Sequence, residues 1–253
     1  MTAAPPSGWR TPPAELALAP GDAHVWRLPL AQPPAPLAVL ARTLDPDEQA
    51  RARRFHFERD RIAYTAARGA LRTLAGRYLG VPPGELVFAY QAKGKPHLDP
   101  AASDLCFNVS HSGNFALLAF TRGSEIGVDV ERRRPLDDLL SLARISFSAA
   151  EYATLCGLPP GHQTDAFFAC WSRKEAFIKT TGEGVSQLAD FDVSLRPGEP
   201  ARLLRVKDEP APPRRWSMHE LPEIAGHAAA LVVERPEIQI ACWDWPPAAW
   251  PSR

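Results

Sequence analysis

The 253-residue chain has no excess of either charge, because 29 lysines and arginines balance 29 aspartates and glutamates. A protein dedicated to nucleic acid or to an anionic membrane surface needs a basic excess, so the balanced charge argues against both classes. The four cysteines form no Cys-x-x-Cys pair and show no metal-ligand spacing. No apolar run approaches the length of a membrane-spanning helix, and the first residues do not resemble a signal peptide. We therefore expect a cytoplasmic protein with reduced thiols.

Several familiar catalytic motifs are also missing. The sequence has no Gly-x-Ser-x-Gly elbow, no His-Glu-x-x-His pair and no Walker loop. Ser110 and His111 are adjacent, and neighbours on a strand face opposite ways, so they cannot readily form a nucleophile–base pair. These absences argue against a serine hydrolase, a zinc protease and a P-loop nucleotidase.

Proline is plentiful, and nine of the 27 prolines fall within residues 1–36. We expect this segment to be extended and partly loose, with residues 23–29 as one edge strand. Beyond it, each half of the chain contains helical stretches and several strands, which predicts an α+β protein of two similar lobes, residues 37–124 and 125–253. The helices are expected at residues 37–44, at 47–79 after the start signal Asp45-Pro-Asp-Glu, and around Trp171. The strands are expected at residues 86–90, 105–111, 115–120, 127–131, 191–195, 202–206, 216–221, 228–233 and 238–243.

One acidic cluster lies in the segment Ile126-Gly-Val-Asp-Val-Glu131. Its period of two places Asp129 and Glu131 on one face of a strand, while Val128 and Val130 point into a core. Two carboxylates on one face repel each other unless a cation lies between them, and Mg²⁺ prefers such oxygen ligands. The alternative is a solvated face of an edge strand.

The segment Trp171-Ser-Arg-Lys-Glu-Ala-Phe-Ile-Lys179 adds a further acid and a base. Glu175 and Lys179 share one face of a helix that should end near Gly182, beside a mostly apolar stripe. The alternative is a routine surface salt bridge between these two residues.

Cation-rich segments precede both acidic segments. Lys93-Gly-Lys-Pro96 sets two lysines around a glycine that lets a phosphate approach the backbone, and residues 51–61 contain five arginines. Between them and the carboxylates, Ser110 and His111 end a strand that turns at Gly113. This order suits a magnesium-bound, multiply phosphorylated small molecule. The alternative for the arginines is a solvated helix face.

Four of these segments, taken together, resemble the successive motifs of the surfactin-type 4′-phosphopantetheinyl transferases. They are Gly94–Pro96, Phe107–His111, Gly127–Glu131 and Trp171–Lys179. Enzymes of this family move the phosphopantetheine arm of coenzyme A to a serine of a carrier protein and release 3′,5′-ADP. The resemblance implies two pseudo-symmetric lobes with the active site between them, and it implies a monomer whose partners are coenzyme A and an apo acyl or peptidyl carrier protein.

The resemblance also implies roles for individual residues. Mg²⁺ would be held by Asp129, Glu131 and Glu175, while Glu175 and Lys179 would be catalytic, with Glu175 accepting the serine proton. Coenzyme A would contact Arg51, Arg54, Lys93, Lys95, Pro96, Ser110, His111 and Lys179. Two other functions remain open from the sequence: a non-catalytic binder of coenzyme A or carrier protein, and a metal-dependent phosphohydrolase that uses water in place of serine.

Overall fold

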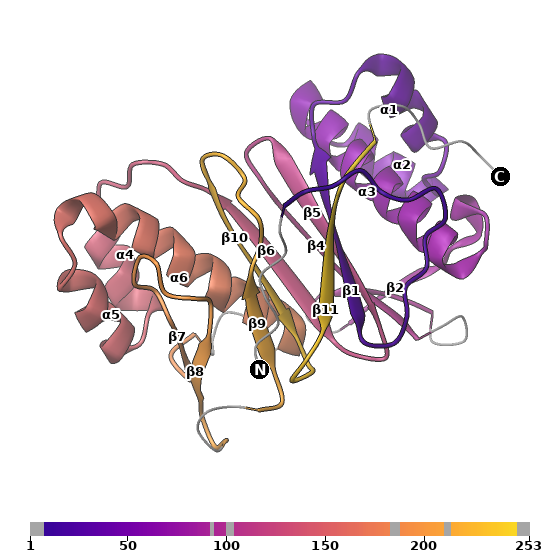
Figure 1. Cartoon of the computed structure of the whole chain (residues 1–253). Helices are drawn as coiled ribbons and strands as arrows, with labels where there is room; N and C mark the ends of the chain where they lie inside the picture. The colour runs from indigo at the N-terminus through magenta and orange to yellow at the C-terminus, as the bar shows by residue number, and fades with distance from the viewer. Residues whose placement is uncertain (1–7, 92–93, 100–103, 183–187, 210–213, 247–253) are drawn as a thin grey trace.

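A computed structural model describes residues 8–91, 94–99, 104–182, 188–209 and 214–246. The molecule has two α+β lobes in which two sheets meet at the centre and the helices lie on the outside (Figure 1). Mainly aliphatic side chains of the two sheets pack against each other and form the core between the lobes. Each sheet also packs against its own long helix on the other face. None of the described helices is long and apolar enough to cross a membrane.

The sheet of the N-terminal lobe has the strand order β11-β1-β5-β4. Its strands are β1 (Asp22–Pro29), β4 (Leu105–Ser112), β5 (Phe115–Arg122) and β11 (Gln239–Asp244). The prediction that residues 23–29 form an edge strand is wrong, because β11 returns from the far end of the chain and pairs in parallel with β1. Strand β1 is therefore enclosed between β5 and β11, and Trp26 is fully buried.

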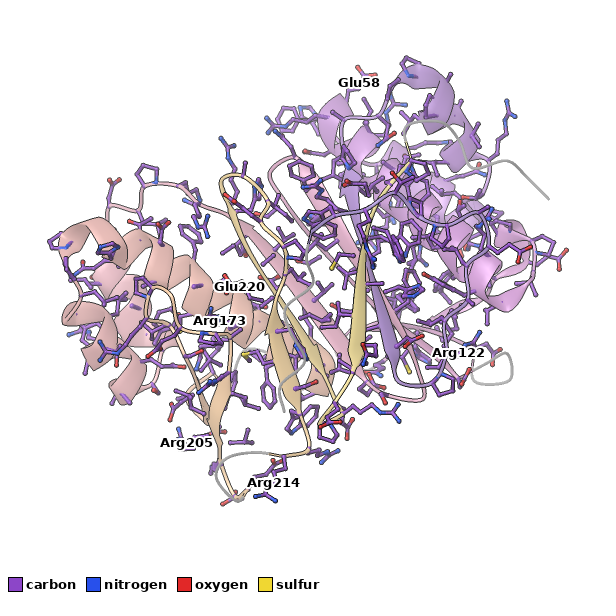
Figure 2. The ribbon with its side chains drawn as sticks, viewed as in Figure 1. Glu58, Arg122, Arg173, Arg205, Arg214 and Glu220 are labelled. Atoms are coloured by element: carbon purple, nitrogen blue, oxygen red, sulfur yellow. The ribbon has the colours of Figure 1, made fainter. Side chains whose placement is uncertain are left out.

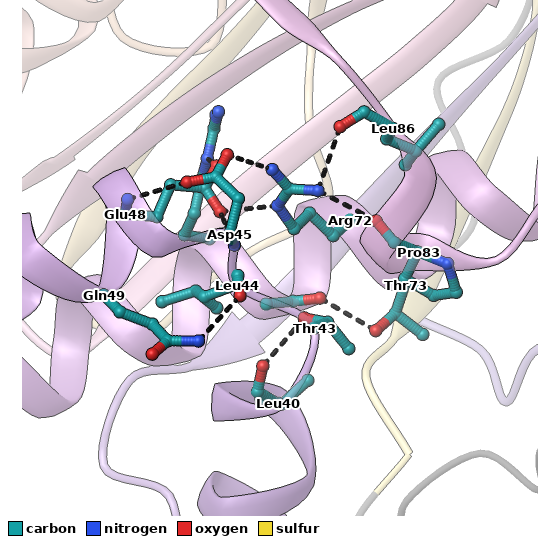
Figure 3. Close-up of polar contacts among 12 residues, drawn as sticks. Leu40, Thr43, Leu44, Asp45, Glu48, Gln49, Arg72, Thr73, Pro83 and Leu86 are labelled. Atoms are coloured by element: carbon teal, nitrogen blue, oxygen red, sulfur yellow. Dashed lines mark hydrogen bonds and ion pairs between the residues drawn. The ribbon is translucent and has the colours of Figure 1, made fainter.

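The helices of this lobe are α1 (Pro34–Ala41), α2 (Pro46–Arg53) and α3 (Glu58–Leu79). The prediction of one helix over residues 47–79 is wrong, since the helix is interrupted between α2 and α3. The break allows α2 to fold back on α3, where the buried Arg72 binds Asp45 and Glu48 and also donates to two backbone carbonyls (Figure 3). The start signal is confirmed, because Asp45 and Glu48 form a capping box. A short 3₁₀ helix η1 (Pro83–Glu85) and the hairpin of β2 (Phe88–Tyr90) and β3 (Pro96–Leu98) follow.

The sheet of the C-terminal lobe has the order β6-β10-β9. Its strands β6 (Ile126–Arg132), β9 (Ser217–Glu220) and β10 (His227–Val233) pair antiparallel, and a separate hairpin joins β7 (Phe191–Val193) and β8 (Leu203–Val206). The helices are α4 (Leu139–Ser146), α5 (Ala149–Cys156) and α6 (Pro160–Thr181). These strands and the end of the Trp171 helix at Gly182 confirm the predicted order of elements.

Helix α6 is held in place by buried polar contacts as well as by its apolar face. Lys174 donates to both carboxylate oxygens of Glu151 on α5, at 3.0 and 2.8 Å, and to the carbonyl of Phe191. Arg173 donates to the carbonyl of Ser194 and lies near Glu220 at the end of β9 (Figure 2). These contacts tie α6 to α5, β7 and β9, so the face that carries Glu175 and Lys179 has a fixed direction.

Candidate active site

A cluster of charged side chains lies where strand β4 of one lobe meets strand β6 of the other. Asp129 on β6 accepts a hydrogen bond from Ser110 on β4 at 2.8 Å. The Nζ of Lys179 on α6 lies 2.6 Å from the same carboxylate oxygen, Oδ1, and 2.9 Å from the Ser110 hydroxyl. Three elements that are far apart in the sequence thus meet at one carboxylate.

Asp129 is only 2 % exposed, and this burial is the main property of the site. Burial raises the pKa of Asp129 to about 6, although Lys179 and Ser110 favour the charged form. Its second oxygen, Oδ2, is buried and has no hydrogen-bond partner in the described part of the chain. The alternative of a solvated strand face is therefore wrong for Asp129. The expected burial of Val128 and Val130 on the opposite face is confirmed.

Two further carboxylates lie on the elements that carry Asp129 and Lys179, strand β6 and helix α6. Glu131, two residues along β6, accepts a hydrogen bond from Ser112 at 3.0 Å. Glu175 lies on α6, one turn before Lys179. Burial raises the pKa of Glu175 above its ordinary value; Lys179 opposes this rise, and Glu131 adds to it. Within the described ranges, Lys179 pairs with Asp129 and not with Glu175, so the interpretation of this pair as a surface salt bridge is wrong.

This donor set fits a hard cation in its chemistry. Among the residues that the structure describes, no group of three or more His, Cys, Asp or Glu side chains is close enough to hold a metal ion together. However, Asp129 keeps one buried oxygen without a partner, and the pKa of Glu175 is raised in part by its neighbour Glu131. A buried anion with a free oxygen and acidic neighbours is an arrangement that a divalent cation stabilises. The oxygen donors of Asp129, Glu131 and Glu175 therefore suit Mg²⁺.

The residues predicted to contact the coenzyme lie on several different elements. Lys95 crosses from one lobe to the other, donating to Glu125 at 2.6 Å and to the carbonyl of Thr180 at 3.2 Å, near the end of α6. Pro96 follows it at the start of β3. His111 is exposed on β4, and Ser110 is buried, as the alternation along a strand predicts. Lys93 lies outside the described residues.

Arg51 and Arg54 lie at the end of α2, on the helical side of the N-terminal lobe. Both side chains are exposed, and the guanidinium of Arg51 lies 5.3 Å from the centre of the Tyr64 ring. Glu58, which begins the next helix, marks the outer end of this region in Figure 2. In the described ranges no hydrogen bond or ion pair joins either arginine to the carboxylates, so the two remain available for a ligand.

Sequence reasoning missed two polar residues that support the cluster, Asn108 and Ser112 on β4. The Asn108 side chain accepts a hydrogen bond from the backbone N–H of Val128, and Ser112 contacts both Glu131 and the N–H of Arg132. The signal was present, because Asn108-Val-Ser-His-Ser112 places three polar residues at a spacing of two. Such spacing predicts one polar face on a strand.

Comparison with known proteins places this chain in one family. Residues 125–232 match the model of the 4′-phosphopantetheinyl transferase superfamily, and residues 32–122 match the model of the N-terminal part of 4′-phosphopantetheinyl transferases. The 4′-phosphopantetheinyl transferase HetI of Nostoc sp. (strain PCC 7120) is 42 % identical over 244 residues, which cover 96 % of this chain and 97 % of HetI. The match to HetI therefore extends along almost the whole of both chains.

More distant relatives share long segments. The 4′-phosphopantetheinyl transferase Sfp of Bacillus subtilis (strain 168) is 34 % identical over 153 residues, 60 % of this chain and 66 % of Sfp. The human L-aminoadipate-semialdehyde dehydrogenase-phosphopantetheinyl transferase is 28 % identical over 215 residues, 79 % of this chain and 70 % of its own length. The resemblance found in the four motifs is confirmed: the chain belongs to the 4′-phosphopantetheinyl transferase superfamily and is an enzyme that transfers phosphopantetheine to carrier proteins.

Proposed function

We propose that the enzyme takes the phosphopantetheine arm from coenzyme A in a Mg²⁺-dependent reaction, with Asp129, Glu131 and Glu175 as metal ligands. The observation that carries this proposal is the buried Asp129 carboxylate, which has a lysine on one oxygen and no partner on the other. A bound Mg²⁺ would neutralise charge on the diphosphate while its phosphorus–oxygen bond breaks. The leaving group is 3′,5′-ADP.

The side chains of the site then have separate roles. The nucleophile is the serine hydroxyl of an apo acyl or peptidyl carrier protein, whose oxygen forms the new bond to phosphorus. Glu175 accepts the proton of that hydroxyl, because burial raises the pKa of Glu175 above that of an ordinary carboxyl group and so makes it a stronger base. Lys179 turns one donor toward the phosphate while it stays near Asp129, and Ser110 holds both groups in register.

The remaining contacts to the coenzyme follow from positive charge and position. We propose that Lys95 and His111 donate to the diphosphate, that Lys93 and Pro96 also contribute to coenzyme binding, and that Arg51 and Arg54 hold the 3′-phosphate. Lys95 would exchange its partner Glu125 for a phosphate oxygen, a more highly charged acceptor. The exposed guanidinium groups of Arg51 and Arg54 can bind a phosphate with paired hydrogen bonds.

The test is the product. The wild type and Asp129→Ala are incubated with coenzyme A, Mg²⁺ and a panel of apo carrier proteins, and the carriers are weighed by mass spectrometry. We expect the wild type to add one phosphopantetheine to a carrier serine and Asp129→Ala to add none, because the buried metal ligand is gone. Free phosphopantetheine would identify a phosphohydrolase, and coenzyme binding without any product would identify a non-catalytic binder. Wild-type turnover by Asp129→Ala at saturating Mg²⁺ would contradict the metal assignment.

A further inference from the structure

Strands β4 and β6 lie side by side at the junction of the lobes although they belong to different sheets. Side chains of β4 join them where backbone carbonyls would do so within one sheet. The N–H of Val128 donates to Asn108 Oδ1 at 3.0 Å, that of Val130 to Ser110 Oγ at 3.4 Å, and that of Arg132 to Ser112 Oγ at 3.0 Å. We call these three hydrogen bonds the rungs. Donor and acceptor are 20 residues apart in every rung, so the strands run parallel in a fixed register.

The rungs alternate with the two acidic residues of β6. Asp129 lies between the first and second rung, and Glu131 lies between the second and third. Each serine hydroxyl also donates to the carboxylate that precedes its rung: Ser110 to Asp129 at 2.8 Å and Ser112 to Glu131 at 3.0 Å. One hydroxyl thus fixes both the backbone of β6 and the direction of a carboxylate.

The first rung is buried. Asn108 is 5 % exposed and Val128 is fully buried, so water cannot replace this hydrogen bond. The rung holds the backbone N–H of Val128, the residue immediately before Asp129. A shift of β6 at this point would move the Asp129 carboxylate relative to Lys179, which approaches from the other side on α6.

We propose that Asn108 and Ser112 are positioning residues for the metal site. Their side chains hold β6 against β4, so that Asp129 and Glu131 stay in the arrangement that binds the cation. The proposal rests on the proposed function, since it takes these two carboxylates as metal ligands. In this proposal each of the two acts through the residue that it contacts on β6, and not by binding the metal itself. Groups that orient metal ligands in this way typically change metal affinity or activity about 10–100-fold when they are removed.

A buried hydrogen bond that only stabilises the fold would behave differently when it is removed. A matched control therefore separates the positioning role from a structural one. Thr121 is fully buried on β5, and its hydroxyl donates to the carbonyl of Asp22 at 2.9 Å, within the N-terminal lobe and away from the carboxylates. Thr121→Val removes a buried hydrogen bond of similar length without touching β6. It should lower the unfolding free energy and leave metal affinity unchanged.

The experiment compares Asn108→Ala, Ser112→Ala, Ser112→Thr and Thr121→Val with the full-length wild type. Mg²⁺ affinity is measured by titration calorimetry with coenzyme A present, unfolding by urea, and kcat and KM for coenzyme A by carrier mass gain. We expect Ser112→Ala to weaken Mg²⁺ binding about 10–100-fold and to lower kcat more than it changes KM. Ser112→Thr restores the hydroxyl and should return both values to near those of the wild type. Asn108→Ala should weaken Mg²⁺ binding and also lower stability.

Ser112 lies near the partly exposed end of β4, so Ser112→Ala keeps the test decisive even where Asn108→Ala does not fold. Wild-type Mg²⁺ affinity and kcat in Ser112→Ala would overturn the proposal and leave the rungs a structural role. A wild type that binds Mg²⁺ but modifies no carrier would remove the proposed function, while the metal affinities of the variants would still decide the positioning role. A wild type that binds no Mg²⁺ in the presence of coenzyme A would overturn both.

Discussion

The chemistry of the site depends on one carboxylate, Asp129, whose charged form is disfavoured by burial. Asp129 lies between a lysine and a serine, yet burial still raises its pKa to about 6. Lys179 is 27 % exposed in its side chain, so its charge is reachable from solvent while that of Asp129 is not. The pair therefore has one buried half and one half that can turn toward a ligand, which suits phosphate binding better than a closed ion pair would.

Replacement of Glu175 and replacement of Lys179 should have different effects on coenzyme binding and on the transfer rate. Glu175→Gln keeps size and hydrogen bonding, so coenzyme binding should survive in part while transfer falls by about 10²–10⁴, as when a general base is lost. Lys179→Ala should weaken coenzyme binding as well as the rate, and its stability loss should stay below the roughly 3–5 kcal/mol of a fully buried pair, because Lys179 is partly exposed. Carrier mass gain over time, coenzyme calorimetry and urea unfolding measure the three effects. Near-normal transfer in both variants would remove these residues from the mechanism.

At the scale of elements, most strands and the motif helix could be predicted from the sequence, because their apolar residues recur at periods of two or 3.6. Two expectations failed for a physical reason that lies outside local sequence. Strand β1 is interior because its partner β11 comes from more than 200 residues further along the chain. The break between α2 and α3 is stabilised by Arg72, which is 24 residues from its partner Glu48. Neither contact leaves a local signal in the pattern of apolar residues.

The same limit applies to the candidate site. The faces of Asp129, Glu131 and Glu175 followed from periodicity, but the pairing of Lys179 with Asp129 spans 50 residues and needs the packing of α6 on β6. Gly127 makes that packing possible. A Cβ at this position would lie 2.2 Å from the carbonyl oxygen of Ala176 on α6, which is a backbone atom and cannot rotate away. The glycine of the Gly-Val-Asp-Val-Glu motif thus sets the distance between the helix and the strand that carry the site.

Gly127→Ala should therefore affect both stability and catalysis. The added methyl group forces α6 away from β6, which should cost about 1–3 kcal/mol, as other overpacked cores do, and should lower transfer by separating Lys179 from Asp129. Gly161→Ala, on the same helix but in open space, is the matched control: the unfolding free energy should stay level or rise by up to about 1 kcal/mol. Urea unfolding and carrier mass gain check both variants. Full activity in Gly127→Ala would show that the spacing of helix and strand does not govern the site.

At the scale of the whole molecule, two histidines, the buried His24 and the partly buried His219, link the stability of both lobes to pH. His24 on β1 is 6 % exposed and its Nδ1 lies 2.8 Å from the Tyr78 hydroxyl; burial lowers its pKa to about 4. Burial lowers the pKa of His219 on β9 to about 4 as well. Unfolded histidine titrates near 6.5, so between pH 4 and 6.5 the unfolded chain binds more protons than the folded chain. The raised pKa of Asp129 acts in the opposite direction over much of the same range.

We expect the unfolding free energy to fall as pH drops from 6.5 to 4, with His24 contributing up to about 3 kcal/mol at about 1.4 kcal/mol per unit of pKa. His24→Gln keeps a side chain that can hydrogen-bond Tyr78 but cannot take up the proton, so it should flatten this slope. His162→Gln is the control, because His162 is exposed at the start of α6 and should leave the slope unchanged. Asp129→Asn should steepen the slope by removing the opposing titration. Urea unfolding at half-unit steps from pH 4 to 7 measures all three, and an unchanged slope in His24→Gln would show that its buried ring does not control the acid stability of the protein.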